Sequence, residues 1–251
     1  MRNKYHFMLI TLLCLSANAE TIKMDGLKYG VTIESSRVIY PLNGPGVSLS
    51  VVNPQNYPVL VQTRILTEEK GEAGPFFVTP PLFRLDAGQR HTLRVNQTGG
   101  NFPQDRESLL WACVKGIPPK ADDLWADNNA VKEGEEKDIG IRLNISIDNC
   151  IKFIVRPEKI TGNLADSARD ILWTISDGAL VAYNSSAFYM NIGKLSFNGV
   201  DFVPDYIPPR GQRSFRLKNT PPKSGTVSWN IIDDYGAFSQ IHSAKVSPDN
   251  K

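Results

Sequence analysis

The chain has 251 residues, among them 19 Gly, 17 Pro and 3 Cys, and its formal net charge is +2 at pH 7. This length predicts one or two domains. A charge so close to zero gives no general attraction to nucleic acid or to an anionic membrane surface, which disfavours partners of either kind.

The first 19 residues have the pattern of a secretory signal peptide. Arg2 and Lys4 precede an apolar run at 7–15, and a small-x-small cleavage site follows at Ala17–Ala19. The apolar run is too short to be a membrane span. Cleavage after Ala19 would remove Cys14 together with both cations and leave an exported chain of zero formal charge.

Short segments with alternating apolar residues recur along the rest of the chain, and turns rich in Gly, Pro and Asn separate them. Many short strands with little helical periodicity are typical of antiparallel β-sandwiches, so we expect an all-β fold. The segments are Gly30–Glu34, Val47–Val51, Val59–Leu66, His91–Val95, Leu109–Val114, Ile171–Ile175, Leu180–Tyr183, Phe188–Ile192, Ser214–Leu217 and Thr226–Ile232.

An acidic insert at Ala121–Asp138 interrupts this pattern. Its carboxylates have neither the spacing of a calcium loop nor that of a catalytic pair. An irregular segment of this length is either functional or disordered, and we interpret this one as a solvated loop. The acidic residues are Asp122, Asp123, Asp127, Glu133, Glu135, Glu136 and Asp138.

The stretch Ile139–Pro157 carries the strongest pattern in the chain. Apolar residues occupy one parity, and polar residues or Gly occupy most of the other, which is the period of a strand with one apolar face. The run is longer than an ordinary strand, so part of it should be available to a partner outside its own sheet. The apolar positions are Ile139, Ile141, Leu143, Ile145, Ile147, Ile151, Phe153 and Val155.

A domain boundary is expected after Pro157, where the polar stretch 158–170 precedes a new set of strands. The chain then divides into a signal peptide at 1–19, a first sandwich at 20–157 and a second at 158–251. Both sandwiches are of a size that one core can stabilise.

Cys113 and Cys150 are the two cysteines of the exported chain. An even pair in an oxidising compartment is most simply a disulfide. The alternative, a reactive thiol beside a histidine, is accompanied by no Cys-x-x-Cys or other nucleophile pattern.

No catalytic or cofactor-binding pattern is found. His91 and His242 are the two histidines after the signal peptide, and neither G-x-S-x-G nor H-E-x-x-H is present. Phosphate loops and metal-binding cysteine–histidine clusters are missing as well, so we expect no enzyme, cofactor or metal. A basic cluster is interpreted as a solvated strand edge: Arg210, Arg213, Arg216 and Lys218.

Five motifs occur together in a fixed order: Thr79–Leu85 (TPPLFRL), Pro103–Leu109 (PQDRESL), Gly116–Pro119 (GIPP), Ile151–Pro157 (IKFIVRP) and Asp233–Gly236 (DDYG). In this combination the chain resembles the periplasmic pilus chaperones of Gram-negative bacteria over essentially its whole exported length. The resemblance implies two immunoglobulin-like sandwiches in an L-shaped arrangement. It also implies a protein that captures exported fimbrial or surface-polymer subunits, completes their fold with a donated strand, and passes them to an outer-membrane usher.

The resemblance assigns roles to individual residues. The donated strand matches Ile139, Ile141, Leu143, Ile145 and Ile147. The pair that binds the C-terminal carboxylate of the subunit matches Arg37 and Lys152, and an ion network between the domains matches Glu107, Arg156 and Asp234. The disulfide pair and the long acidic insert resemble the long-loop branch of the family, which serves thin, capsule-like or non-fimbrial polymers.

Alternatives stay open at this stage. A secreted Ig-like adhesin or carbohydrate-binding module is the second hypothesis, although an internal donor-like strand followed by another domain is unusual for it. A hydrolase on a β scaffold is opposed by the missing catalytic residues. An exposed apolar strand favours self-association of the free protein, and the isomer of the Thr79–Pro80 bond is open.

Overall fold

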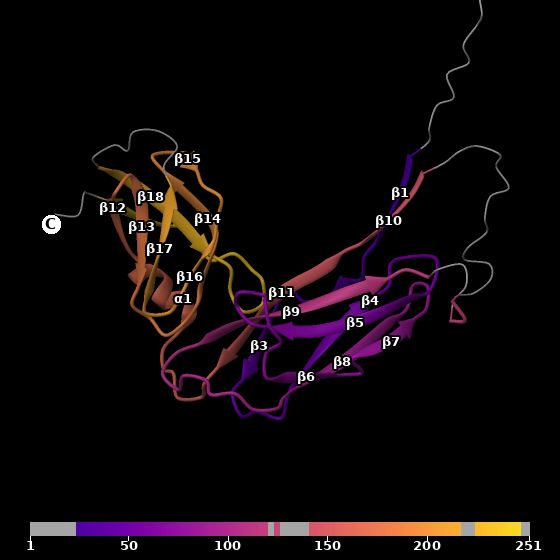
Figure 1. The fold of residues 1–251 in the computed structure, drawn as a ribbon. Coiled ribbons are helices and arrows are strands. Elements are labelled where there is room, and N and C mark those ends of the chain that lie inside the picture. The colour runs from indigo at the N-terminus through magenta and orange to yellow at the C-terminus, as the bar shows by residue number, and fades with distance from the viewer. Residues whose placement is uncertain (1–23, 120–122, 126–140, 217–223, 247–251) are drawn as a thin grey trace, which may run out of the picture.

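The structure is a computed structural model that describes residues 24–119, 123–125, 141–216 and 224–246. For 24–29 and 141–145 it describes the backbone alone. Two β-sandwiches meet at an angle, which gives the molecule the L shape seen in Figure 1. The all-β fold with two sandwiches, expected from the sequence, is confirmed.

The first sandwich consists of a five-stranded sheet in the order β3-β11-β9-β5-β7 and a four-stranded sheet in the order β2-β4-β8-β6. Among the described strands of these two sheets, only β3 and β11 run parallel to each other. The strands are β2 (Thr32–Ile33), β3 (Arg37–Pro41), β4 (Val47–Val52), β5 (Val59–Leu66), β6 (Phe76–Thr79), β7 (Leu82–Leu85), β8 (Arg90–Gln97), β9 (Ser108–Ile117) and β11 (Asp148–Arg156). The Thr79–Pro80 peptide bond is cis.

The core of the first sandwich follows from the alternating sequence. In β5, every second residue from Val59 to Ile65 is buried, and the residues between them are at least partly exposed. The opposite sheet contributes Leu49 and Leu93, which are fully buried. Two apolar faces packed in this way remove their side chains from water, which is the main stabilisation of a sandwich.

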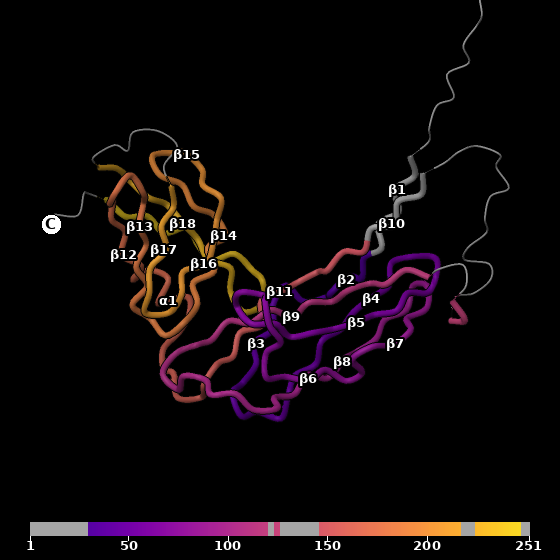
Figure 2. The backbone as a smooth tube through the Cα atoms, in the orientation of Figure 1, coloured from indigo at the N-terminus to yellow at the C-terminus, as the bar shows by residue number. Residues whose placement is uncertain are grey.

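The second sandwich packs the sheet β12-β13-β17 against the sheet β15-β14-β18-β19, and β16 pairs with β14. The elements are α1 (Leu164–Ser167), the 3₁₀ turn η1 (Ala168–Asp170), β12 (Leu172–Ser176), β13 (Ala179–Asn184), β14 (Met190–Phe197), β15 (Val200–Asp201), β16 (Tyr206–Ile207), β17 (Gly211–Arg216), β18 (Gly225–Ile231) and β19 (His242–Val246). Figure 2 follows the backbone from β11 into this sandwich. Every strand pairing among the described residues joins strands on the same side of Pro157.

The long apolar stretch is divided into two strands. β10 (Ile141–Ser146) pairs in parallel with β1 (Met24–Tyr29), whereas β11 pairs with β9 and β3. The partner changes at Ile147, and the strand is interrupted there because two different sheets use its two halves. Ile139 lies outside the described residues. In Figure 1, β10 extends away from the body of the first sandwich.

Candidate functional site

Arg37 and Lys152, the two cations predicted to anchor a subunit, lie side by side on neighbouring strands of the first sandwich. Arg37 begins β3, and Lys152 is its opposed partner on the parallel strand β11. Opposed residues in a sheet project from the same face. The register of β3 against β11 therefore places a guanidinium and an ammonium group next to each other.

Residues of the second sandwich close over this pair. The Lys152 Nζ donates a hydrogen bond of 2.6 Å to Asn191 Oδ1 and lies 5.0 Å from the centre of the Tyr206 ring. Asn191 and Tyr206 are themselves opposed partners on β14 and β16. The Arg37 Nη1 donates to the carbonyl oxygen of Ile232, just after β18, at 3.0 Å. The two cations thus lie between the sandwiches.

Burial lowers the pKa of both cations, and repulsion by Arg37 adds to the effect on Lys152. Burial lowers the pKa of Lys152, and the neighbouring Arg37 lowers it further, to about 8. Burial also lowers the pKa of Arg37, although Asp234 and Asp233 act in the opposite direction. Within the described part of the chain, Arg37 Nε is buried without a hydrogen-bond partner. The pair is suited to a carboxylate, which a guanidinium and an ammonium group can both contact.

An ion network joins the two sandwiches beside this pair. Arg156, the last residue of β11, donates Nε to Glu107 at 2.6 Å and its two terminal nitrogens to Asp234 at 2.6 and 2.8 Å. Asp234 follows β18, so one guanidinium group bridges both sandwiches. The other oxygen of Glu107 accepts the backbone N–H of Tyr189 at 2.7 Å. Arg156 therefore contacts both of the other residues named from the family resemblance, Glu107 and Asp234.

The network is largely removed from water. The Glu107 side chain is 1% exposed. Burial raises the pKa of Glu107, and Arg156 opposes this change. Burial also acts against the charge of Arg156, yet its two carboxylate partners raise the pKa of Arg156 overall. Loss of one member would leave a buried charge without its partner, which is costly.

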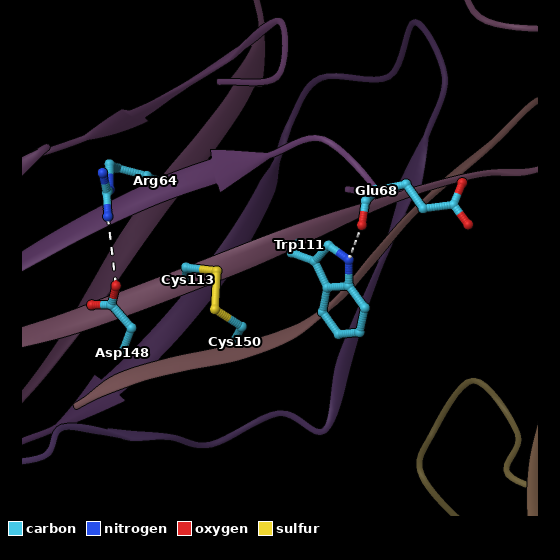
Figure 3. The surroundings of a disulfide bond; sticks show 6 residues. All are labelled: Arg64, Glu68, Trp111, Cys113, Asp148 and Cys150. Carbon is cyan, nitrogen blue, oxygen red and sulfur yellow. Dashed lines mark hydrogen bonds and ion pairs between the residues drawn. A yellow bond between two sulfur atoms is a disulfide. The ribbon is translucent and has the colours of Figure 1, made fainter. Parts of the chain in front are cut away.

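A second contact between the sandwiches, centred on Glu68, was missed from the sequence. Glu68 lies in the turn after β5, where Oε1 accepts the Tyr206 hydroxyl at 2.8 Å and Oε2 accepts the Tyr189 hydroxyl at 3.3 Å. Its backbone carbonyl accepts a hydrogen bond from Trp111 Nε1 at 2.9 Å, as Figure 3 shows. Neither an isolated glutamate in a turn nor single tyrosines form a recognisable pattern, and Asn191 was missed for the same reason.

The basic cluster differs from the solvated edge expected for it. Arg210 forms an ion pair with Asp105 of the first sandwich. Arg213 donates Nε to the carbonyl oxygen of Tyr206 at 2.8 Å, and its guanidinium carbon lies 4.5 Å from the Tyr206 ring. Arg216 is exposed, as expected, and Lys218 lies outside the described residues. Two of the four cations thus take part in the interdomain region.

The strand β11 has an open stretch next to the two cations. It pairs with β9 from Asp148 onwards but with β3 only from Lys152 onwards. Residues 148–151 therefore have no strand partner on the β3 side within the described residues. A cavity of about 290 Å³ lies along this stretch, between Thr32–Ile33 of β2 and Asn149–Ile151 of β11. β10 pairs with one strand among those that the structure describes, β1.

The predicted disulfide is present and lies in the same stretch. Cys113 and Cys150 are opposed partners on β9 and β11, with a Cα–Cα distance of 4.0 Å. Figure 3 shows the bond between the Arg64–Asp148 ion pair, at 3.6 Å, and the side chain of Trp111. The disulfide thus ties the half-open part of β11 to the centre of the sheet.

The histidines do not form a site together. His91 lies in β8 of the first sandwich, with its ring 4.6 Å from that of Phe83. His242 begins β19 of the second sandwich, and its ring lies 5.7 Å from that of Trp229. Among the described residues no helix combines the length and hydrophobicity needed to cross a bilayer.

The fold and the site define a two-domain β-sandwich protein with a pair of cations between its domains and a strand that projects from the first domain. Residues 30–161 match the family described as pili and flagellar-assembly chaperone, PapD N-terminal domain, and residues 166–243 match its partner, the PapD C-terminal domain. The chain belongs to this family of pili assembly chaperones.

Individual relatives agree with the family assignment. The chain is 47% identical over 242 residues to the chaperone protein caf1M of Yersinia pestis, and the match covers 94% of each chain. Its fold is similar to the Escherichia coli chaperone DraB, with a TM-score of 0.76 and 35% identity over 90% of this chain and all of that one. It is also similar to a chain in the complex of the Salmonella enterica SafA pilin with the SafB chaperone, with a TM-score of 0.74 and 36% identity over 86% and 96% of the two chains.

Proposed function

We propose that this protein is a periplasmic chaperone that binds fimbrial or capsule-like surface subunits by lending them the strand β10–β11 and then delivers them to an outer-membrane usher. The observation that carries the proposal is the pair Arg37 and Lys152, placed side by side at the point where the open stretch of β11 ends. The family match and the pilin complex of a relative support it over the adhesin alternative.

The lent strand would act through its apolar residues. An incomplete sandwich exposes an apolar groove and unpaired strand edges, which aggregate readily. A strand with five apolar positions of one parity can fill such a groove and pair with its edges. Each inserted Ile or Leu contributes roughly 1.5–3 kcal/mol before the cost of ordering. The proposed positions are Ile139, Ile141, Leu143, Ile145 and Ile147.

The two cations would fix the register of the incoming strand. A slip of one residue would turn every apolar side chain to the wrong face, so pairing alone does not define the position. A strand that runs parallel to β11 in line with β3 ends at Arg37 and Lys152. A subunit whose last residue lies there presents its terminal carboxylate to both cations.

The domain boundaries, the branch of the family and the role of the ion network are proposed from the sequence and from the family resemblance. We assign residues 1–19 to a cleaved signal peptide, 20–157 to a strand-donating domain and 158–251 to a second domain. Cys113 and Cys150, paired in the structure, support membership of the long-loop branch. Glu107, Arg156 and Asp234 would hold the angle between the domains without contacting the subunit.

Lys152→Ala should reduce subunit capture about a hundred-fold, because a buried ammonium–carboxylate contact of about 2.7 kcal/mol is lost. The mature chain is expressed in the periplasm with the subunit gene of its locus, and wild type and variant of different mass compete for limiting subunit. Native mass spectrometry then gives the ratio of the two complexes. Equal occupancy of both chains, with the disulfide intact in each, would contradict the proposed anchor.

Capture should weaken as the pH rises above 8. The Lys152 ammonium has a pKa of about 8 in the free protein, and a bound carboxylate raises that pKa, so the protonated form binds better. The sign follows directly: affinity is full below pH 8 and falls above it, about ten-fold between pH 7 and 9. The Lys152→Arg variant stays charged throughout this range and should show a flat profile. The same slope in both chains would assign the titration to another group.

A further inference from the structure

Tyr206 contacts three charged side chains at once. Its ring lies 5.0 Å from Lys152 Nζ and 4.5 Å from the guanidinium carbon of Arg213. Its hydroxyl donates a hydrogen bond of 2.8 Å to Glu68. Glu68 and Lys152 belong to the first sandwich, whereas Tyr206 and Arg213 belong to the second. Tyr206 therefore connects the anchoring cation to a contact between the two domains.

Hydrogen bonds fix both the backbone and the side-chain hydroxyl of Tyr206. β16 consists of two residues, and its pairing with β14 sets Tyr206 opposite Asn191. Arg213 Nε binds the Tyr206 carbonyl oxygen at 2.8 Å, which fixes the backbone, and Glu68 fixes the far end of the ring. A tyrosine held in this way keeps its ring in a fixed position next to the Lys152 ammonium.

Lys152 needs such a support more than Arg37 does. A lysine ammonium is a point charge on a flexible stem, with three donors and no preferred direction. Arg37 repels it, and Asn191 accepts only one of its hydrogen bonds. The face of an aromatic ring attracts a cation, most strongly where water is excluded. The Tyr206 ring and the Asn191 side-chain amide thus both contact the ammonium.

We propose that Tyr206 is a positioning residue of the anchor: with its hydroxyl fixed by Glu68, its ring holds the Lys152 ammonium beside Arg37, where both cations can receive one carboxylate. This inference rests on the proposed function and deepens it. The ability of the two cations to bind a carboxylate then depends on the contact that Glu68 makes between the domains. A change that loosens this contact should weaken subunit capture even though both cations remain.

Three variants separate the ring from its hydrogen bond. Tyr206→Leu removes the ring, Tyr206→Phe keeps the ring and removes the hydroxyl, and Glu68→Gln keeps an acceptor and removes its charge. The matched control is Tyr57→Phe, which deletes a hydroxyl bonded to Gln55 Oε1 at 3.2 Å in the loop before β5, at the other end of that strand from Glu68.

Competition for limiting subunit, read by native mass spectrometry, gives the first expected result. Tyr206→Leu should lose about ten-fold in capture, equivalent to about 1.4 kcal/mol, and Tyr206→Phe and Glu68→Gln about three-fold each. The double variant Tyr206→Phe with Glu68→Gln should lose little more than Tyr206→Phe alone, because Glu68→Gln weakens the same hydrogen bond that Tyr206→Phe removes. Tyr57→Phe should equal wild type.

The titration of the Lys152 side chain, followed by nuclear magnetic resonance, gives a second result that a purely structural role would not produce. The charged groups that act on Lys152 are Arg37, Asp205 and Arg213. They remain in every variant, so a changed midpoint reports the surroundings of the ammonium. Loss of the ring lets the ammonium move away from Arg37 and into water. These changes relieve the two causes that lower the pKa of Lys152 and outweigh the lost attraction of the ring, so the midpoint should rise from about 8 in Tyr206→Leu. Tyr206→Phe should keep the wild-type midpoint.

The outcomes separate this inference from the proposed function. If Lys152→Ala loses capture while Tyr206→Leu keeps wild-type capture and midpoint, the positioning role is wrong and the anchor stands. If Lys152→Ala captures subunit normally, the anchor itself fails. If the losses of Tyr206→Phe and Glu68→Gln add in the double variant, Glu68 contributes to capture through a contact other than the Tyr206 hydroxyl. Tyr206→Phe retains the aromatic ring and serves as the decisive variant if Tyr206→Leu does not fold.

Discussion

Replacing Arg156 with methionine should lower the free energy of unfolding by about 3–5 kcal/mol, which is the usual cost of removing one partner of a buried ion pair. The reason lies in Glu107, whose side chain is 1% exposed and whose oxygens face Arg156 and the Tyr189 backbone N–H. Without the guanidinium, that carboxylate keeps one hydrogen bond and no opposite charge. Asp234 would lose both of its bonds to Arg156 in the same change.

The double variant Glu107→Gln with Arg156→Met is the control for this prediction. A neutral amide accepts the Tyr189 N–H without a buried charge, so the double variant should be more stable than Arg156→Met alone. Urea unfolding followed by tryptophan fluorescence reports both sandwiches, since Trp111 lies in the first and Trp173 in the second. If Arg156→Met unfolds at the wild-type urea concentration, the network does not stabilise the native state.

The urea curve also tests whether the network couples the sandwiches. Arg156 ends the strand β11, and Asp234 follows β18, so the bond crosses between two separate cores. Other contacts cross there as well, among them Glu68 to Tyr206 and Arg210 to Asp105. We expect the variant to unfold in two steps where wild type unfolds in one. A single sharp step in the variant would show that these remaining contacts are sufficient for coupling.

The fold could be predicted from the sequence because strands are marked by local alternation. The predicted segment Val59–Leu66 coincides with β5, and its buried residues follow the predicted period. The break at Ile147 could not be predicted in this way. It depends on which strand pairs with each half of the stretch, and β1 and β9 lie far away in sequence.

The site residues are even harder to predict from local sequence than the strands are. Arg37 and Lys152 were named only because a family resemblance pointed to them, since a single cation in a strand is ordinary. No motif of the family resemblance includes Tyr206, and its partner Glu68 is 138 positions away in the sequence. Neither residue belongs to a periodic pattern, and their roles arise from the meeting of two domains. Contacts of this kind become visible only when the register of β14 against β16 is known.

Replacing both Cys113 and Cys150 with alanine should lower the free energy of unfolding by about 4 kcal/mol, the value that the chain-entropy model gives for this loop. The bond joins residues 37 positions apart, so its loss greatly enlarges the unfolded ensemble. The measurement is urea unfolding of the double variant beside wild type with and without a reductant. Reduced wild type should match the variant, and a difference between them would assign part of the effect to the substitution.

The disulfide should matter more for capture than for the rest of the fold. Cys150 lies in the stretch 148–151 of β11, which has β9 on one side and no strand on the β3 side among the described residues. A strand held by one neighbour opens more readily than one held by two, and this strand is the one that must present an ordered edge to the subunit. We therefore expect the variant to capture subunit less well even at temperatures where it is folded. Wild-type capture by a folded variant would show that the β9 pairing alone keeps this edge in place.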